Sequence, residues 1–180
     1  MKETTLSRNT IAFIALANEY CQDIEDSLNN TKEVFLALML KKLPRIYIAV
    51  TDVIKSEHCD DDDQEYICIE PYLTEEDYNS MRNNIYQLLG EDDIYLEVFE
   101  EDMKYSDTPI TATISENLCD LYQEFYNFIQ TIKNSSSELV NEIVYIEKEN
   151  FESYWGQTLL NVIRAIHNLK FTEHDNDFEI

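Results

Sequence analysis

Glycine and proline are almost missing from this chain, which has two glycines and three prolines among 180 residues. An all-β protein of this length would need both residue types in its many tight turns, so their scarcity argues against a sandwich or barrel. Long helices joined by few turns fit such a composition. The chain is therefore predicted to be all-α, a single-domain bundle of about six helices over residues 1–170, followed by a polar tail over residues 171–180.

Long apolar runs are also missing, and the longest, Val34–Leu40, is much shorter than a membrane-spanning helix. The amino-terminal residues do not have the pattern of a secretory leader. The four cysteines are far apart and form no C-x-x-C pair, so reduced buried thiols are expected rather than disulfides. These features predict a cytoplasmic protein that does not contact a membrane.

Basic residues are scarce, with 13 Lys and Arg against 37 Asp and Glu, and the net charge is -24. Residues 57–107 hold eighteen acids against Arg82 and Lys104, a net -16. Such a field repels phosphate backbones and anionic lipid, which disfavours direct nucleic-acid binding, whereas a basic protein partner suits it. The predicted acidic interaction surface comprises Asp60, Asp61, Asp62, Asp63, Glu91, Asp92, Asp93, Glu97, Glu100, Glu101 and Asp102.

Apolar residues recur at helical spacing along most of the chain. The apolar faces of the predicted helices span Ile11–Leu28, Phe35–Ile54, Thr74–Gly90, Thr111–Lys133, Leu139–Ile146 and Phe151–Leu169. Pro44 removes a backbone donor inside the second helix, so a kink or short break is expected near Lys41 to Leu43. Residues 92–107 are ambiguous: Ile94 and Leu96 alternate as in a strand, but the surrounding acids favour a short helix, which is our interpretation.

Five phrases of the chain resemble a family of proteins from Bacteroidetes-type bacteria that is designated only as a domain of unknown function. The phrases are ANEYC (17–21), LTEEDY (73–78), LLGEDDIYLEVFEED (88–102), ISENLCDLYQEFYNF (114–128) and YWGQTLLNVIRAIH (154–167). The resemblance spans nearly the whole chain and implies an all-helical intracellular domain. It implies no catalytic or binding residues.

Carboxylates at helical spacing raise the question of a metal site. Glu116, Asp120 and Glu124 recur every four residues, as in the di-iron sites of helical bundles. However, these acids lie away from the apolar stripe of their helix and should face water, and no histidine stands three residues after a glutamate. The acidic stretch from Asp60 also lacks the glycine and the final glutamate of a calcium loop. No metal and no cofactor is therefore predicted.

The last predicted helix carries the best candidates for a small-molecule site. Arg164 and His167, with Trp155 and Gln157, could line a pocket that offers a cation and a titratable base beside an aromatic wall. A histidine at the border of an apolar stripe is more often a boundary residue that bonds a backbone carbonyl. No nucleophile is apparent nearby, so the sequence gives no clear sign of an enzyme.

Three functions remain open from the sequence. The first is a non-enzymatic interaction or regulatory module that engages a basic protein through residues 57–107. The second is an enzyme or small-molecule binder with a pocket around Trp155, Arg164 and His167. The third is a DNA mimic, which would need carboxylates ordered at phosphate-like spacing. The oligomeric state is not encoded in any motif of the chain.

Overall fold

The structure is a computed structural model that describes residues 6–54, 68–97 and 110–172. These residues form six α-helices and one two-stranded sheet, which confirms the predicted all-α single domain. The helices are α1 (Arg8–Glu25), α2 (Lys32–Thr51), α3 (Glu75–Leu89), α4 (Ile114–Asn134), α5 (Val140–Asn150) and α6 (Gly156–Thr172). The remaining elements are β1 (Ile94–Leu96), β2 (Thr111–Thr113), the 3-10 turns η1 (Ser27–Asn29) and η2 (Gly90–Asp93), and the π-helical turn η4 (Phe151–Trp155).

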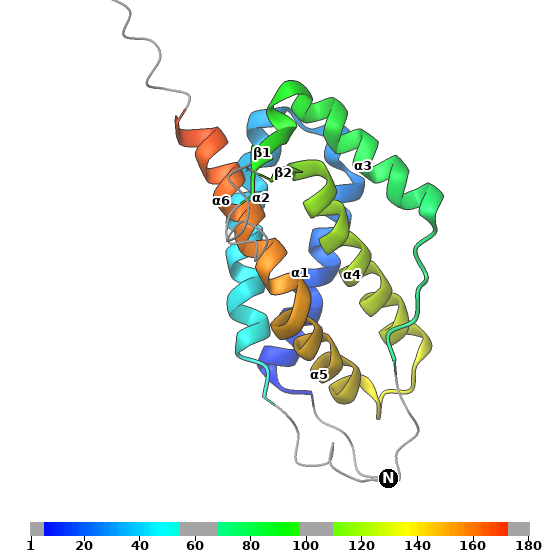
Figure 1. The fold of residues 1–180 in the computed structure, drawn as a ribbon. Coiled ribbons are helices and arrows are strands. Elements are labelled where there is room, and N and C mark those ends of the chain that lie inside the picture. The colour runs from blue at the N-terminus through cyan, green and yellow to red at the C-terminus, as the bar shows by residue number, and fades with distance from the viewer. Residues whose placement is uncertain (1–5, 55–67, 98–109, 173–180) are drawn as a thin grey trace, which may run out of the picture.

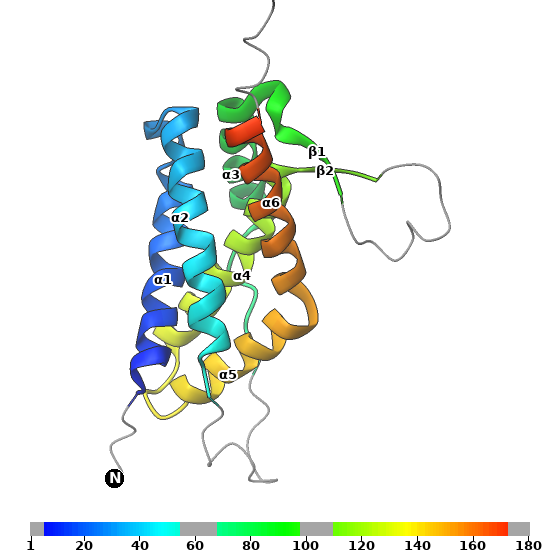
Figure 2. The same cartoon turned by 90° about the vertical axis from the view of Figure 1, so that its left-hand side faces the viewer.

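The long helices α1, α2, α4 and α6 form the body of the bundle (Figure 1). Helix α4 packs against α1 on one side and α6 on the other, and α2 contacts α1 and α6, which closes the ring. Helix α3 lies outside this ring and packs against α4. Helix α5 crosses the lower end of the bundle (Figure 1). The β1–β2 hairpin projects sideways near the end of the bundle where α3 and α6 also lie (Figure 2). Strand β1 therefore lies beside α6 but is not part of the helical core.

Aromatic rings fill the centre of the bundle. Trp155 is 1% exposed, and its ring centroid lies 5.0 Å from that of Phe125 and 4.8 Å from that of Phe151. Phe13 stacks on Trp155 with the two ring centroids 6.5 Å apart. Edge-to-face and stacked ring pairs add to the free energy gained from burying their area, by about 0.5–1.5 kcal/mol each. The aromatic centre therefore holds α1, α4 and η4 together.

Both ends of helix α3 are set by local residue chemistry. The Thr74 hydroxyl accepts a hydrogen bond from the Asp77 N–H at 3.1 Å and donates one to the Asp77 carboxylate at 2.7 Å. Gly90 ends the helix with φ of 61°, a conformation that favours glycine. A hydroxyl cap at Thr74 and a glycine stop at Gly90 therefore bound this helix.

The structure excludes one of the two alternatives expected at Pro44 and corrects the expectation for residues 94–96. Helix α2 runs without interruption through Pro44, so no break occurs at residues 41–43, and the kink stays a prediction. Ile94 and Leu96 lie in strand β1 and not in a short helix, because η2 ends at Asp93 and Tyr95 pairs with Ala112 of β2. The alternation of apolar residues was the correct signal there. Residues 98–107 of the same stretch lie outside the described residues.

Close packing at Gly156 explains why glycine occurs inside a helical segment. The backbone of η4 winds more widely than an α-helix, and α6 begins at Gly156 directly after it. A Cβ atom at Gly156 would lie 2.6 Å from the carbonyl oxygen of Phe151 and 2.9 Å from its ring carbon Cε2. No side chain fits in this space without displacing backbone.

Replacing Gly156 with alanine should destabilise the protein, although alanine is the better helix former. Overpacking of this kind costs about 1–3 kcal/mol, which exceeds the gain of about 1 kcal/mol in helix propensity. Chemical denaturation of the variant should show a lower midpoint. The control is Gln123→Ala on the exposed face of α4, which should leave the midpoint unchanged or raise it slightly. A Gly156→Ala protein as stable as the wild type would contradict the close packing.

Candidate binding cleft between β1 and α6

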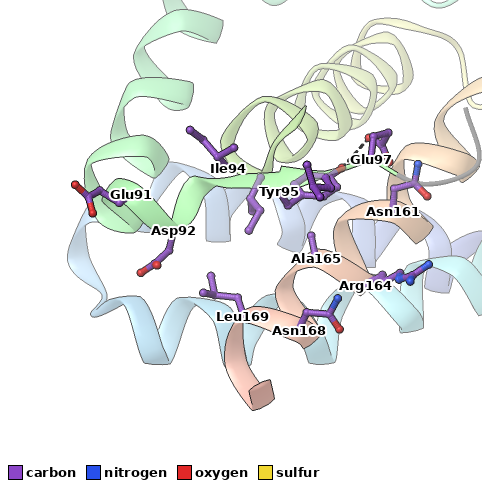
Figure 3. A pocket seen from close by; sticks show the side chains of 12 residues that line it. Glu91, Asp92, Ile94, Tyr95, Glu97, Asn161, Arg164, Ala165, Asn168 and Leu169 are labelled. Atoms are coloured by element: carbon purple, nitrogen blue, oxygen red, sulfur yellow. Dashed lines mark hydrogen bonds between the residues drawn. The ribbon is translucent and has the colours of Figure 1, made fainter. Parts of the chain in front are cut away.

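A cleft of about 580 Å³ separates the β1 side of the hairpin from α6 (Figure 3). This volume lies within the range of sites that hold a small ligand or a few residues of a peptide. The cleft is lined by Glu91, Asp92, Ile94, Tyr95, Leu96, Glu97, Ile114, Asn161, Arg164, Ala165, Asn168 and Leu169. Residues more than sixty positions apart in the sequence thus face one space.

A buried carboxylate holds the hairpin wall in position. Asp93 is 1% exposed and accepts two hydrogen bonds of 2.7 Å, from the backbone N–H and from the hydroxyl of Ser115 in the first turn of α4. Two charge-assisted bonds at a helix amino terminus compensate for burying the carboxylate. Further along, the Glu97 N–H donates to the Ile110 carbonyl at 2.8 Å. The direction of β1 is therefore fixed at both of its ends.

The hairpin wall is apolar in its middle and acidic at its start. Ile94 is 64% exposed and Leu96 is 60% exposed, which is high for large apolar side chains. Glu91 is exposed, and the Asp92 carboxylate pairs with the ammonium group of Lys32 on α2. Glu97 is buried and accepts a 2.9 Å hydrogen bond from the Tyr95 hydroxyl. Glu91 is thus the acid on this wall that is open to a ligand.

The α6 wall is a row of polar side chains at helical spacing. Asn161, Arg164 and Asn168 stand on one face, and all three line the cleft (Figure 3). Asn161 is 6% exposed, and its carbonyl oxygen accepts a 3.1 Å hydrogen bond from the Gln157 amide. Arg164 is exposed, and no carboxylate within residues 6–54, 68–97 and 110–172 forms an ion pair with it. Its guanidinium group is available to a ligand.

The four residues expected to form a pocket on the last helix do not come together. Trp155 is buried in the aromatic centre and cannot line an open site, which corrects its assignment to the pocket. Arg164 lines the cleft, and Gln157 reaches it only through its hydrogen bond to Asn161. His167 is exposed outside the cleft, with its ring centroid 4.9 Å from that of Phe171. Arg164 and His167 lie three residues apart on α6, but Arg164 lines the cleft and His167 contacts Phe171.

The predicted acidic surface is only partly visible in the structure. Asp60, Asp61, Asp62, Asp63, Glu100, Glu101 and Asp102 lie outside the described residues. Among the other four members, Asp93 and Glu97 are buried and support the hairpin, so they do not belong to an interaction surface. Glu91 and Asp92 remain, and both lie at one end of the cleft (Figure 3).

A second group of carboxyls, on α4 and α5, contains one fully buried member. Glu147 is 0% exposed, and burial together with the nearby Glu124 charge raises the pKa of its carboxyl well above the ordinary value. Burial likewise raises the pKa of Glu124, and Asp120 accepts a 2.7 Å hydrogen bond from the Tyr78 hydroxyl. Asp120 and Glu124 are half-buried, so the expectation that they face water was wrong. They pack against neighbours outside the main apolar stripe.

The position of Glu147 carries a sequence signal that was missed. Glu147 follows Val140 by seven residues and Ile143 by four, so it continues their buried face. Its Oε1 atom and the Trp155 Nε1 atom both lack a hydrogen-bond partner among the described residues.

No group of three His, Cys, Asp or Glu side chains in the described part of the chain is arranged to hold a metal ion.

The described thiols are not activated as nucleophiles. Burial raises the pKa of Cys21, and it raises the pKa of Cys119 to about 12. Cys68 is exposed, and its hydrogen bond to Glu70 raises the pKa of its thiol. A thiol needs a lowered pKa to react readily at neutral pH, so these groups behave as inert side chains.

Comparisons with known proteins agree with this architecture. Residues 4–172 match the family described as domain of unknown function (DUF5063). The chain is also similar to protein BF1032 of Bacteroides fragilis, known from a crystal structure, with 29% identity and a TM-score of 0.76. That match covers 97% of this chain and 98% of the other. No curated protein matches the chain. The resemblance drawn from the five sequence phrases is confirmed.

None of the described helices has the length and apolarity needed to cross a membrane.

Replacing Glu147 with glutamine should stabilise the protein at neutral and alkaline pH. The folded protein binds the Glu147 proton more tightly than the unfolded chain, so wild-type stability falls as pH rises above the ordinary glutamate value of 4.5. Glutamine does not ionise, so the variant lacks the loss of stability that ionisation of Glu147 causes. Thermal melting of both proteins between about pH 4 and about pH 8 should show a difference in melting temperature that widens as pH rises.

The matched control for this measurement is Glu149→Gln, an exposed position on the same helix. It should follow the wild-type melting curve across the pH range. Equal pH dependence of the Glu147→Gln and wild-type proteins would show that Glu147 is not buried as a protonated acid.

Proposed function

We propose that this chain, which belongs to the DUF5063 family, is a non-enzymatic binding module that takes up part of a basic partner protein in the cleft between β1 and α6. The observation that carries the proposal is the exposure of Ile94 and Leu96 in a cleft whose opposite wall is polar. Large apolar side chains on a concave surface with a polar rim are typical of protein-interaction sites.

Electrostatics support a basic partner. The chain carries a net charge of -24, and Glu91 is open at one end of the cleft. A field of this sign accelerates the approach of a cationic protein and repels nucleic acid. The raised thiol pKa values support the non-enzymatic assignment. Reduced buried cysteines also support a location in the cytoplasm, which stays a prediction.

The rival functions have weaker support. A DNA mimic needs a face of ordered carboxylates, but Asp93 and Glu97 are buried. A pocket around Trp155 is not formed, because that ring is in the core. A small anionic ligand retains one favourable observation, the exposed Arg164 without an ion pair among the described residues. It is therefore the second candidate for the same cleft.

Capture of the partner should depend on the cleft residues. Immobilised full-length protein, incubated with a lysate of the cells that produce it, should retain a basic protein at low salt. Glu91→Gln should slow its association and reduce its salt dependence, and Leu96→Ser should weaken retention through loss of apolar contact. Surface plasmon resonance with the identified partner measures both effects.

Two exposed positions outside the cleft provide controls. His167→Ala changes the same helix as Arg164, and Ile54→Ser removes an exposed apolar side chain that is 84% accessible. Neither should alter binding. Binding that is lost with His167→Ala, but not with Glu91→Gln or Leu96→Ser, would place the site elsewhere. A small anion that binds the wild type but not Arg164→Ala, with no protein retained, would favour the second candidate.

A further inference from the structure

We propose that the partner enters the cleft as an extended peptide segment, which pairs with the outer edge of β1 and adds a third strand to the hairpin. This inference rests on the proposed function, because it specifies the form in which a partner occupies the same cleft. It differs from the proposed function in requiring main-chain hydrogen bonds to β1, which a folded surface or a small molecule would not form.

The pairing pattern identifies which backbone groups of β1 point outward. Glu97 donates its N–H to Ile110 of the β2 side, and Tyr95 lies opposite Ala112. Hydrogen-bonding direction alternates along an antiparallel strand, so Tyr95 and Glu97 turn their N–H and C=O groups toward β2. The N–H and C=O of Leu96 consequently point to the other edge. Within the described residues no backbone group bonds to them.

The outer edge of β1 lies on the cleft side. β2 occupies the opposite edge and continues directly into α4, whereas α6 lies across the cleft (Figures 1 and 3). An exposed strand edge offers a row of donors and acceptors to any extended chain. β1 is therefore a template for one further strand between the hairpin and α6.

The opposite wall can bind the second edge of such a strand. The Asn168 side-chain amide has a donor and an acceptor, and Asn161, whose carbonyl oxygen accepts from Gln157, adds the N–H donors of its amide, so this wall can bond N–H and C=O groups of a peptide. Asn161 is 6% exposed yet lines the cleft, and its bond from Gln157 holds the amide in place. A fixed polar group in a buried position costs little entropy on binding.

Side chains around the cleft define the chemistry of the segment. Alternate side chains of an added strand would lie beside Ile94 and Leu96, so apolar residues suit those positions. In Figure 3, Glu91 and Asp92 lie toward one end of the cleft and Arg164 toward the other. A Lys or Arg at the first end and a carboxylate at the second end complement these charges.

A second copy of the same chain is disfavoured as the occupant. Each copy carries a net charge of -24, so bringing two together is opposed by repulsion over the whole surface. A segment rich in Lys or Arg experiences attraction instead. The proposal therefore commits to an extended segment of a different, basic protein.

The test is peptide selection followed by two substitutions at one position. A phage-displayed library of random peptides is selected against the full-length protein. The peptides have about twelve residues, so that they extend beyond β1. The selected peptides should alternate apolar residues and carry Lys or Arg. Leu96→Pro removes the outward N–H and keeps the pairing with β2, because proline is tolerated where the strand edge faces outward. Leu96→Ala removes the side chain and keeps the N–H.

Fluorescence anisotropy with a selected peptide then measures the dissociation constants. Leu96→Pro should raise the constant about tenfold relative to Leu96→Ala, as expected for the loss of one main-chain hydrogen bond in a closed site. Circular dichroism and thermal melting confirm that both variants are folded. N-methylation of the peptide at alternate residues should abolish binding in one register and spare it in the other.

The outcomes separate this inference from the proposed function. Peptides that bind Leu96→Pro and Leu96→Ala equally, and still lose affinity with Glu91→Gln, would overturn strand pairing and leave the binding cleft intact. Selection of no peptide, while a folded basic protein is retained, would overturn the inference in the same way. Peptides insensitive to every cleft substitution would contradict both the inference and the proposed function.

Discussion

The π-helical turn at Phe151–Trp155 determines where α6 runs, and the cleft exists because of that direction. Trp155 packs among Phe13, Phe125 and Phe151, so the end of the turn is fixed in the aromatic centre. Gly156 allows the backbone of α6 to start against Phe151. An uninterrupted α-helix through this region would rotate α6 about its axis, and the face that carries Asn161, Arg164 and Asn168 would no longer point toward β1.

Acidic residues have two distinct roles in this chain. Asp93 supports the hairpin wall by capping α4, and Glu97 is bonded to the Tyr95 hydroxyl, so both contribute to the shape of the cleft and not to its open surface. Glu91 remains exposed at the cleft, where its charge can act on a partner. Glu147 is buried and forms no ion pair with a cation among the described residues, and we expect it to reduce stability at neutral pH. Total charge therefore overstates how much acid a partner could meet.

The helical fold could be predicted from the sequence because local signals determine it. Apolar periodicity gives the helices, and Thr74 and Gly90 bound α3 as their chemistry requires. The cleft could not be predicted, since it depends on how far the hairpin stands from α6, which no local pattern records. Trp155 and Arg164 are nine residues apart in the consecutive elements η4 and α6, yet one is in the core and the other in the cleft. The spacing of Glu147 did indicate burial, but a glutamate there contradicts the usual preference and was overlooked.

Binding of an extended partner by main-chain groups of β1, across from α6, can be followed at a single amide. The experiment is hydrogen exchange of the Leu96 amide, measured by NMR with and without a selected peptide. We expect strong protection of the Leu96 N–H in the complex, with little change at the Tyr95 and Glu97 amides, which already bond toward β2. An unprotected Leu96 amide in a saturated complex would contradict it.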